Sequence, residues 1–295
     1  MDSGSGVDSL ACVLGKKSLL TWKTGRYERN IVADEVVAAF IPKPLPPSEP
    51  PLVLEGRLDS SLKRAEGALG RLELTGAMVP SVSWFLYSLV RKEAVISSQI
   101  EGTQATLMDL LAFEAAGKVE SDGTADIQEV CNYLDALNFA RQQLHNPKGL
   151  PVSVRLLNET HRRLMRGVRG AEKRPGELRR SQNWIGGTRP GNAAYVPPPA
   201  HAVGTLLNQV EKFIHRKSAV PAIVRAGLVN VQFETIHPYL DGNGRIGRLL
   251  ITLLFEHYHP DNRLLDEAPP PDKPAPPRRV ELPCDRGQVS AGVGA

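Results

Sequence analysis

The sequence of 295 residues predicts an all-α fold arranged as a helical bundle, and three observations support this prediction. Over long stretches, apolar residues recur at three- and four-residue steps, which is the spacing of one face of a helix. Aromatic residues make up only 5% of the chain, and alternating runs of β-branched residues are scarce, which argues against an all-β fold. Hydrophobic residues at 41% and charged residues at 23% are ordinary for a globular protein with a substantial core.

The first part of the chain predicts an extended start followed by helices. Residues 1–30 are expected to be poorly ordered, and the Pro-rich segment 41–51 is expected to run extended. Helical spacing begins near residue 55 and ends near residue 116, where the Gly- and Asp-rich stretch 115–126 interrupts it. We therefore predict an N-terminal helical region over 31–118.

The region 119–260 carries the strongest helical signals, and we expect it to form the core of the protein. Gly, Pro and Asn dominate its middle, 173–200, which predicts a β-hairpin or flap rather than a helix. The Pro-rich tail, 261–295, cannot pack a core and is expected to be disordered. Helices are predicted over 125–144, 152–165, 201–216, 221–236 and 244–258.

Composition and short motifs exclude several classes of protein. The N-terminus lacks the basic and apolar segments of a signal peptide, and no run approaches the ~18 apolar residues of a membrane span. Cys12, Cys131 and Cys284 lie far apart without a CxxC pair, so we expect no disulfide framework, no zinc site and a cytoplasmic location. The net charge is +4, and no basic motif interleaved with aromatic residues indicates a nucleic-acid partner. The Arg-rich stretch 155–189 is interpreted as solvated helix faces and phosphate-binding arginines, and His161 as a surface or packing residue.

Residues 237–248, HPYLDGNGRIGR, combine a turn signal with the start of a helix. Gly242 and Gly244 can adopt positive φ, so successive backbone amides of the turn can point inward as a nest that binds an anion. The next helix is expected to begin near Gly244, and its N-terminal amides and dipole face the same place. The segment therefore predicts a phosphate-binding turn.

The charged residues of this segment complete the set of groups that a phosphate-handling site needs. Asp241 supplies an oxygen ligand suited to Mg²⁺, which binds through one or two carboxylates together with substrate phosphates. His237, just before the turn, is placed to accept a proton from an attacking hydroxyl. Arg245 and Arg248 lie three residues apart and can flank the anion.

This segment resembles the signature of Fic-domain proteins, HxFx(D/E)GNGRxxR, and departs from it only at Tyr239, which replaces one aromatic ring by another. The resemblance implies a Fic-type helical bundle with a small β-hairpin flap, and a catalytic core over 119–260. It also implies a protein adenylyltransferase that moves AMP from Mg-ATP to a hydroxyl of a target protein and releases pyrophosphate. Doc-like relatives that phosphorylate instead depart from GNG in this turn. Carried over by position, the general base is His237, the magnesium ligand is Asp241, the phosphate nest is Gly242, Asn243, Gly244 and Gly247, and the phosphate-holding arginines are Arg245 and Arg248.

A second stretch, SSQIEGT at 97–103, resembles the family's inhibitory motif (S/T)xxxE(G/N). Ser97 and Glu101 are four residues apart, so one helix face presents both, and Gly102 is a natural helix stop. In the family this glutamate pairs with the last arginine of the signature, here Arg248. A carboxylate competes with a phosphate for one guanidinium group, so the resemblance implies an inhibitory helix before the core.

A third stretch, 183–200, resembles the Fic flap, whose extended edge aligns a target segment by main-chain pairing. Trp184 is assigned to packing against the core. The residues assigned to target alignment are Gly186, Gly187, Tyr195 and Val196.

Two alternatives to AMP transfer stay open at this point. In the first, the protein removes AMP from a modified protein, and Glu101 aligns a water molecule. In the second, it is a catalytically impaired nucleotide-binding module, because a Pro-rich tail stands where relatives continue with further helices. ATP and a target protein of unknown identity are the expected partners, and self-modification and a homodimer are left open.

Overall fold

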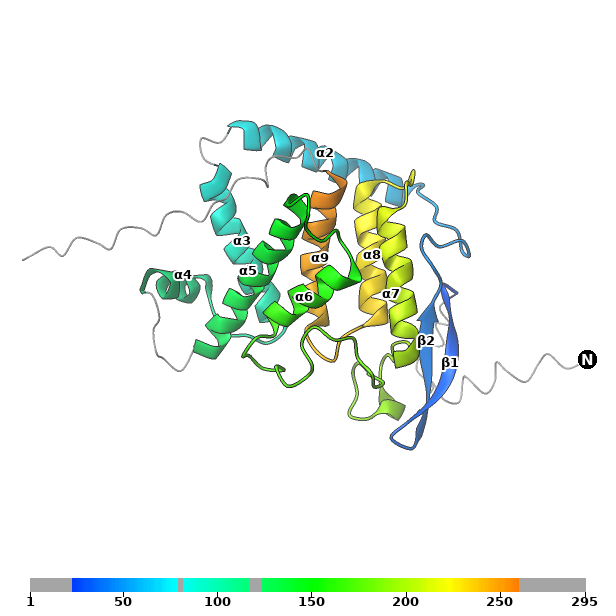
Figure 1. Ribbon diagram of the computed structural model, residues 1–295. Helices are drawn as coiled ribbons and strands as arrows, with labels where there is room; N and C mark the ends of the chain where they lie inside the picture. The colour runs from blue at the N-terminus through cyan, green and yellow to red at the C-terminus, as the bar shows by residue number, and fades with distance from the viewer. Residues whose placement is uncertain (1–22, 79–81, 117–123, 260–295) are drawn as a thin grey trace, which may run out of the picture.

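The computed structural model describes residues 23–78, 82–116 and 124–259, and the helices within these ranges confirm the all-α prediction (Figure 1). The described part contains eight α-helices, one pair of antiparallel strands and a short 3₁₀ turn. The helices are α2 (Arg57–Met78), α3 (Val82–Ile100), α4 (Leu107–Ala116), α5 (Thr124–His145), α6 (Val154–Leu164), α7 (Ala200–His215), α8 (Ala222–Ile236) and α9 (Asn243–Tyr258).

Helix α9 lies at the centre of the bundle, with α5 and α6 on one side and α8 and α7 on the other (Figure 1). Five of its apolar residues belong to one large core cluster and are fully buried, which stabilises the fold by about 1.5–3 kcal/mol for each such side chain. The start of α9 is therefore held in place by packing along the whole helix. The buried apolar side chains of α9 are Ile246, Leu249, Leu250, Leu253 and Leu254.

Helices α5 and α6 follow from the amphipathic patterns that predicted them. The α6 side chains at 156, 157, 160, 161 and 164 are buried, which is the three- and four-residue spacing of one helix face. Ser153 begins α6, because its hydroxyl accepts a hydrogen bond from the Leu156 amide at 3.2 Å. The segment that follows α6 contacts the turn before the start of α9, because Lys173 pairs with Asp241 there.

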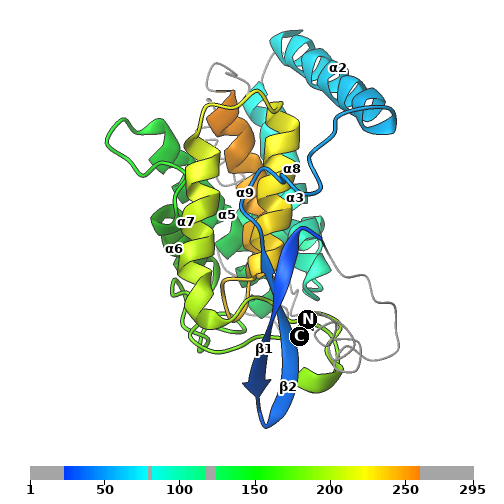
Figure 2. The same cartoon turned by 90° about the vertical axis from the view of Figure 1, so that its right-hand side faces the viewer.

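Residues 25–42 form a β-hairpin, which contradicts two predictions: poor order through residue 30, and helices from residue 31. Strand β1 (Gly25–Val32) pairs with β2 (Glu35–Pro42), and Figure 2 shows the hairpin beside the lower end of α8. Side chains 37 to 41 of β2 are all buried, because β2 lies between β1, α8 and the segment around Val196. A strand buried on both faces shows no alternation in its sequence, so its pattern was missed. The rest of the predicted disordered N-terminus, 1–22, and the predicted disordered tail, 261–295, lie outside the described residues.

The predicted flap, 173–200, is an irregular loop closed by a single bridge. Ile185 and Tyr195 form an isolated antiparallel bridge, and a 3₁₀ turn, η1 (Pro190–Asn192), lies between them. The prolines at 190 and 197–199 have no amide hydrogen to donate, which prevents a longer ladder. The Phe40 amide of β2 donates instead to the Val196 carbonyl at 2.9 Å, so the N-terminal hairpin supplies the strand beside the flap.

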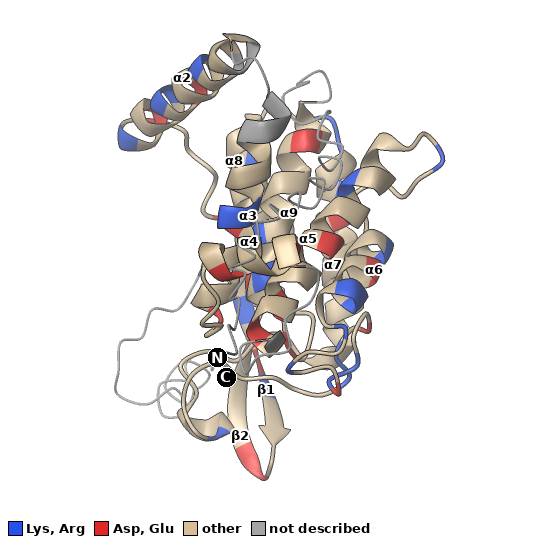
Figure 3. Cartoon of the chain, turned by 90° about the vertical axis from the view of Figure 1, so that its left-hand side faces the viewer, with Lys and Arg blue, Asp and Glu red and all other residues tan. Residues whose placement is uncertain are grey.

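Both signs of charge alternate along the outer helices, as Figure 3 shows for α2 and α6. Within the Arg-rich stretch, Arg162 pairs with Glu159 and Arg180 pairs with Glu177 on the surface. None of the helices that the structure describes is both long enough and apolar enough to cross a membrane.

Candidate functional site

His237 ends helix α8 in a left-handed backbone conformation, with φ 50° and ψ 63°. Pro238 follows it, so the chain leaves the helix and turns toward the start of α9. Burial is the main cause that lowers the pKa of the His237 imidazole to about 4, and the Arg179 guanidinium acts in the same direction. The ring is therefore neutral near pH 7 and able to accept a proton.

The turn that begins α9 matches the predicted nest in part, because Gly242 has positive φ whereas Gly244 is a residue of the helix. Gly242 is the N-cap residue with φ 72°, and the first amides of α9, at Asn243, Gly244 and Arg245, have no acceptor within the helix. The Asn243 side chain closes the turn, because it accepts from the Tyr239 amide at 2.8 Å and donates to the Tyr239 carbonyl at 2.9 Å. Asn243 is buried. Its side chain holds the turn through Tyr239, and its backbone amide is one of the unpaired donors at the start of α9.

Asp241 lies in the same turn with one carboxylate oxygen on each of two donors. Its Oδ1 accepts from the Gly242 amide at 2.7 Å, and its Oδ2 faces the Lys173 ammonium at 2.9 Å. Partial burial would raise the pKa of this carboxyl, but Lys173 and the Gly242 amide outweigh burial and lower it. Asp241 is therefore an ionised carboxylate that is paired with the Lys173 ammonium.

His161 supports this turn from α6, which confirms its interpretation as a packing residue, although it is buried rather than on the surface. Its ring stacks on Tyr239 with centroids 3.9 Å apart. The Gly176 amide donates to its Nδ1 at 2.8 Å, so the hydrogen on Nε2 can be donated to the Asp241 carbonyl at 3.0 Å. Burial lowers the pKa of this imidazole to about 4.

Arg248 faces the end of α3 and contacts both polar residues of the predicted inhibitory motif. Its Nε donates to the Ser97 hydroxyl at 2.7 Å, and its NH2 donates to Glu101 Oε1 at 2.7 Å. A Cβ atom on Gly244 would overlap Glu101 Oε1, so this carboxylate lies directly against the first turn of α9. Gly102 then ends the helix with φ 99°.

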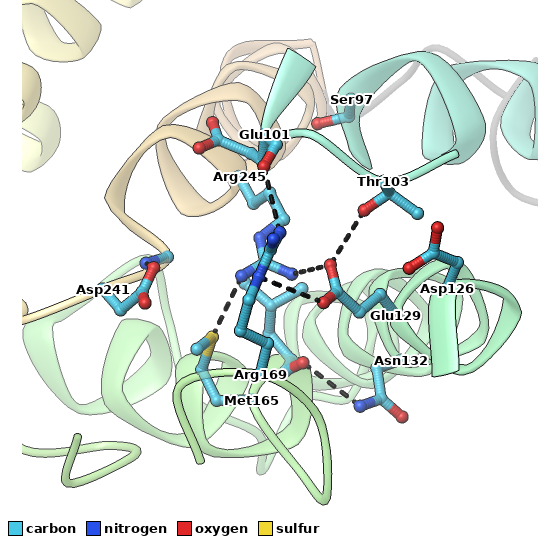
Figure 4. A network of polar contacts seen from close by, with 12 residues as sticks. Ser97, Glu101, Thr103, Asp126, Glu129, Asn132, Met165, Arg169, Asp241 and Arg245 are labelled. Carbon is cyan, nitrogen blue, oxygen red and sulfur yellow. Dashed lines mark hydrogen bonds and ion pairs between the residues drawn. The ribbon is translucent and has the colours of Figure 1, made fainter. Parts of the chain in front are cut away.

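Arg245 points away from the nest and is buried in a polar network, so the structure does not place it with Arg248 (Figure 4). Its side chain is 3% exposed and forms an ion pair with Glu129 of α5 at 3.3 Å. Glu129 also accepts from the Thr103 hydroxyl at 2.9 Å. Arg169, in the loop after α6, lies 3.8 Å from Glu129 and donates to the Glu101 carbonyl at 3.0 Å. The network therefore fixes the turn that carries Glu101.

Gly247 lies outside the nest as well. It is in the second turn of α9 and faces α8, where a Cβ atom would overlap the Glu234 carboxylate. A hydrogen atom at this position lets α8 and α9 approach closely. Gly247 thus belongs to the packing of the two helices that carry the site.

The flap residues are held by contacts that differ from the predicted ones. Trp184 is 40% exposed, so the packing role predicted for it is wrong. Tyr195 has that role, because its hydroxyl donates to the Thr235 carbonyl of α8 at 2.8 Å. Gly186 and Gly187 turn the chain with φ 69° and 77°. Val196 is 8% exposed and its carbonyl is already bonded to β2, so a target strand has no access to this acceptor.

The structure thus brings most of the predicted site residues together at the start of α9. Sequence reasoning missed Lys173, Arg169 and Arg179, all of which lie in the Arg-rich stretch interpreted as solvated or phosphate-binding. It also missed Glu129, because a buried carboxylate within an amphipathic helix carries no local signal. The residues that converge are Ser97, Glu101, His237, Asp241, Gly242, Asn243, Gly244 and Arg248.

Solved structures with a similar arrangement are Fic proteins. A Fic family protein from Desulfovibrio desulfuricans has a TM-score of 0.57 at 22% identity, and the match covers 73% of this chain and 62% of that one. Fic-1 from C. elegans has a TM-score of 0.54 at 22% identity, covering 68% of this chain and 59% of that one. At these identities the likeness concerns the fold.

Curated relatives share about half of the chain. A protein from Aedes aegypti named protein adenylyltransferase Fic is 30% identical over 178 residues, which is 57% of this chain and 34% of that protein. The protein of the same name from Drosophila erecta is 28% identical over 165 residues, which is 55% of this chain and 31% of that protein. The chain therefore spans about a third of the length of these relatives.

Two family models match the chain directly. The model described as Fic/DOC family N-terminal matches residues 60–142, which include α3 and most of α5. The model described as Fic/DOC family matches residues 151–255, which include His237 and the turn that begins α9. Together these matches cover more than half of the chain. With the signature segment, the helical bundle and both matches in agreement, the chain belongs to the Fic/DOC family.

Proposed function

We propose that the protein is a protein adenylyltransferase that transfers AMP from Mg-ATP to a hydroxyl of a target protein and that is inhibited by its own Glu101. The observation that carries the proposal is the contact of Arg248 with Glu101 at 2.7 Å, beside a neutral histidine and an anion nest. The names of the curated relatives support the same reaction.

Each group of the site has a task in this reaction. The acceptor hydroxyl loses its proton to His237 while its oxygen attacks the α-phosphorus of ATP, and the bond from that phosphorus to the bridging oxygen breaks. Pyrophosphate leaves with the electron pair of that bond. The first amides of α9 stabilise the phosphate charge, because helix N-termini present unpaired donors and a positive dipole end.

Asp241 is the residue of this turn that suits Mg²⁺. In the described ranges, no group of three His, Cys, Asp or Glu side chains converges as a complete metal site. One ionised carboxylate that shares the ion with substrate phosphates matches the preference of Mg²⁺ for few protein ligands. When bound there, the ion would neutralise phosphate charge. The Lys173 ammonium pairs with Oδ2 of Asp241, so Lys173 would have to move away for Mg²⁺ to bind this oxygen.

The inhibition follows from competition for one guanidinium. Arg248 lies against Gly244 of the nest, and it bonds to both Ser97 and Glu101. A terminal phosphate of ATP needs the same donors, and two anions cannot share them without repulsion. Glu101 also lies against Gly244, so its carboxylate takes up space beside the nest.

Transfer of label from ATP tests the proposal. Purified wild-type protein, Glu101→Gly and Glu101→Gly/His237→Ala are incubated with ATP labelled in the α-phosphate, and in parallel with ATP labelled in the γ-phosphate. We expect strong α-label on the Glu101→Gly protein or on added target, weak label with wild type and none after the His237 change. Glu177→Gly is the matched control, since Glu177 is an exposed loop carboxylate paired with Arg180, and it should behave like wild type.

The other outcomes identify the alternatives. Label from γ-phosphate would mean a kinase. Wild-type protein that strips α-label from a product made by Glu101→Gly would mean removal of AMP. Folded protein that takes no label in any variant, yet binds ATP, would refute transfer and leave a nucleotide-binding module.

A further inference from the structure

Arg179 is buried against the turn that carries His237. It lies in the loop after α6 and is only 2% exposed. Its guanidinium donates to the carbonyls of Ile236 at 3.2 Å and of His237 at 2.8 Å. It also donates to the carbonyls of Pro198 at 2.5 Å and Ser181 at 3.1 Å. One side chain therefore joins the end of α8 to both ends of the flap segment.

The partners of this arginine are unusual for a buried cation. In the part of the chain that the structure describes, its side chain bonds to carbonyl oxygens alone, and no carboxylate pairs with it. Burial lowers its pKa to about 10, so it stays charged near neutral pH. Buried charges are usually paired with an opposite charge. Here the negative end of the α8 dipole and four carbonyl groups take that role.

The position of Arg179 affects His237 in two ways. The last carbonyls of a helix have no partner inside the helix, and Arg179 binds two of those at the end of α8. It thereby holds His237 in a left-handed conformation that a non-glycine residue adopts only under constraint. It also sets a positive charge between the negative helix end and the imidazole, which disfavours a second positive charge on the ring.

We propose that Arg179 is a positioning residue for His237, which fixes the main chain of the α8–α9 turn and cancels the negative end of α8 that would otherwise favour an imidazolium. This inference rests on the proposed role of His237 as proton acceptor. A helix C-terminus normally favours imidazolium. The inference goes further than the proposed function because it names Arg179 as a group that opposes protonation of His237 at this position.

The charged groups around His237 oppose one another. Glu101 from the end of α3 and Asp241 from the turn favour the imidazolium, and Arg179 favours the neutral ring. Burial acts in the same direction as Arg179 and is the larger cause. Removal of Arg179 alone should therefore move the pKa of His237 upward, toward the ordinary histidine value.

The test is an NMR titration of the histidine rings in the full chain. The chain has seven histidines, and the His237 signal is the one that is lost in His237→Ala. In wild type we expect this ring to stay neutral down to about pH 5, one unit above its pKa of about 4. Arg179→Gln, which keeps a short donor but removes the charge, should raise the pKa of His237 by roughly one unit or more. Arg179→Lys, which keeps the charge but not the planar fork, should leave it low.

Two internal controls separate this effect from general loosening of the fold. His161 is buried with a pKa lowered to about the same value, and Arg179 is not among the groups that set it, so its titration should stay unchanged. Arg225 is the matched control, because it binds the carbonyls of Phe213, Ile214 and Arg216 at the end of α7 in the same manner. Arg225→Gln should leave the His237 titration as in wild type.

Activity gives a second readout in the Glu101→Gly background. Arg179→Lys should lower kcat for AMP transfer at least tenfold with little change in KM for ATP, because the base is misplaced while the nest is intact. An unchanged His237 pKa in Arg179→Gln would overturn the proposal. If that variant does not fold, an ordinary His237 pKa or an undiminished kcat in Arg179→Lys would do so. If Glu101→Gly itself transfers nothing, the proposed function fails, and the NMR result still decides the role of Arg179.

Discussion

Replacing Glu129 by Leu is expected to leave a buried cation without its counter-charge. Glu129 and Arg245 have side chains 5% and 3% exposed and form an ion pair at 3.3 Å. The substitution keeps most of the volume but removes both carboxylate oxygens, and Thr103 loses its acceptor as well. Water cannot reach the guanidinium group to replace what is lost, so the folded state carries the full cost.

The magnitude follows from the burial of the pair. Removal of one partner of a buried ion pair costs about 3–5 kcal/mol. For a domain of this size, each kcal/mol lowers Tm by about 2–4 °C, so we expect Tm to fall by about 6–20 °C. Replacing both partners, as Glu129→Leu/Arg245→Met, leaves no buried charge and is expected to recover most of that loss.

The assay is unfolding by urea and by heat for wild type, both single variants and the double variant. The control is Glu177→Leu, which breaks an exposed pair with Arg180 and should cost less than about 0.5 kcal/mol. A Glu129→Leu protein within about 1 kcal/mol of wild type would contradict the reasoning. So would a double variant less stable than both single variants, because it would show that packing rather than charge decides the result.

Three further outcomes are expected. Arg169→Ala removes the donor to the Glu101 carbonyl, so AMP labelling should rise several-fold above wild type without reaching the level of Glu101→Gly; unchanged labelling would count against a role of this contact in inhibition. Gly242→Ala places a side chain at φ 72°, with its Cβ 2.9 Å from the Met165 sulfur, so urea unfolding should show a loss of at least about 1–2 kcal/mol. The free energy of unfolding should be intact above pH 6.5 and fall toward pH 4, because the folded-state pKa values of His161 and His237 are lowered from 6.5 to about 4 and the unfolded chain binds protons first. The slope is about 1.4 kcal/mol per pH unit for each of these rings, and an identical slope in His161→Asn would refute that assignment.

The helices and the turn at Gly242 could be predicted because their signals are local. Amphipathic spacing marks α5 and α6, and a DGNG segment before an apolar run marks a turn that leads into a helix. The likeness of the SSQIEGT stretch to an inhibitory motif likewise placed Glu101 correctly beside Arg248. The contact between Glu101 and Arg248 joins two residues that each belong to a short motif, so it could be predicted from those motifs.

The remaining features depend on residues far apart in the chain. Arg245 and Arg248 lie three apart on one helix, yet one meets Glu129 in the core and the other meets Glu101 near the surface. Only the positions of α3 and α5 around α9 decide which arginine lies beside the nest and which is buried in the core. Strand β2 was missed for the same reason, since the segments that bury its two faces are distant in sequence.

The ion pair between Glu129 and Arg245 also crosses the two segments that match family models, 60–142 and 151–255. The two segments therefore share one buried ion pair, so one segment cannot be exchanged between relatives independently of the other. A chimaera that takes residues 60–142 from a relative must bring a carboxylate to position 129, or it buries the positive charge of Arg245 unopposed. Expression of residues 151–255 alone would leave that charge, and the apolar face of α9 that packs on α5, open to water.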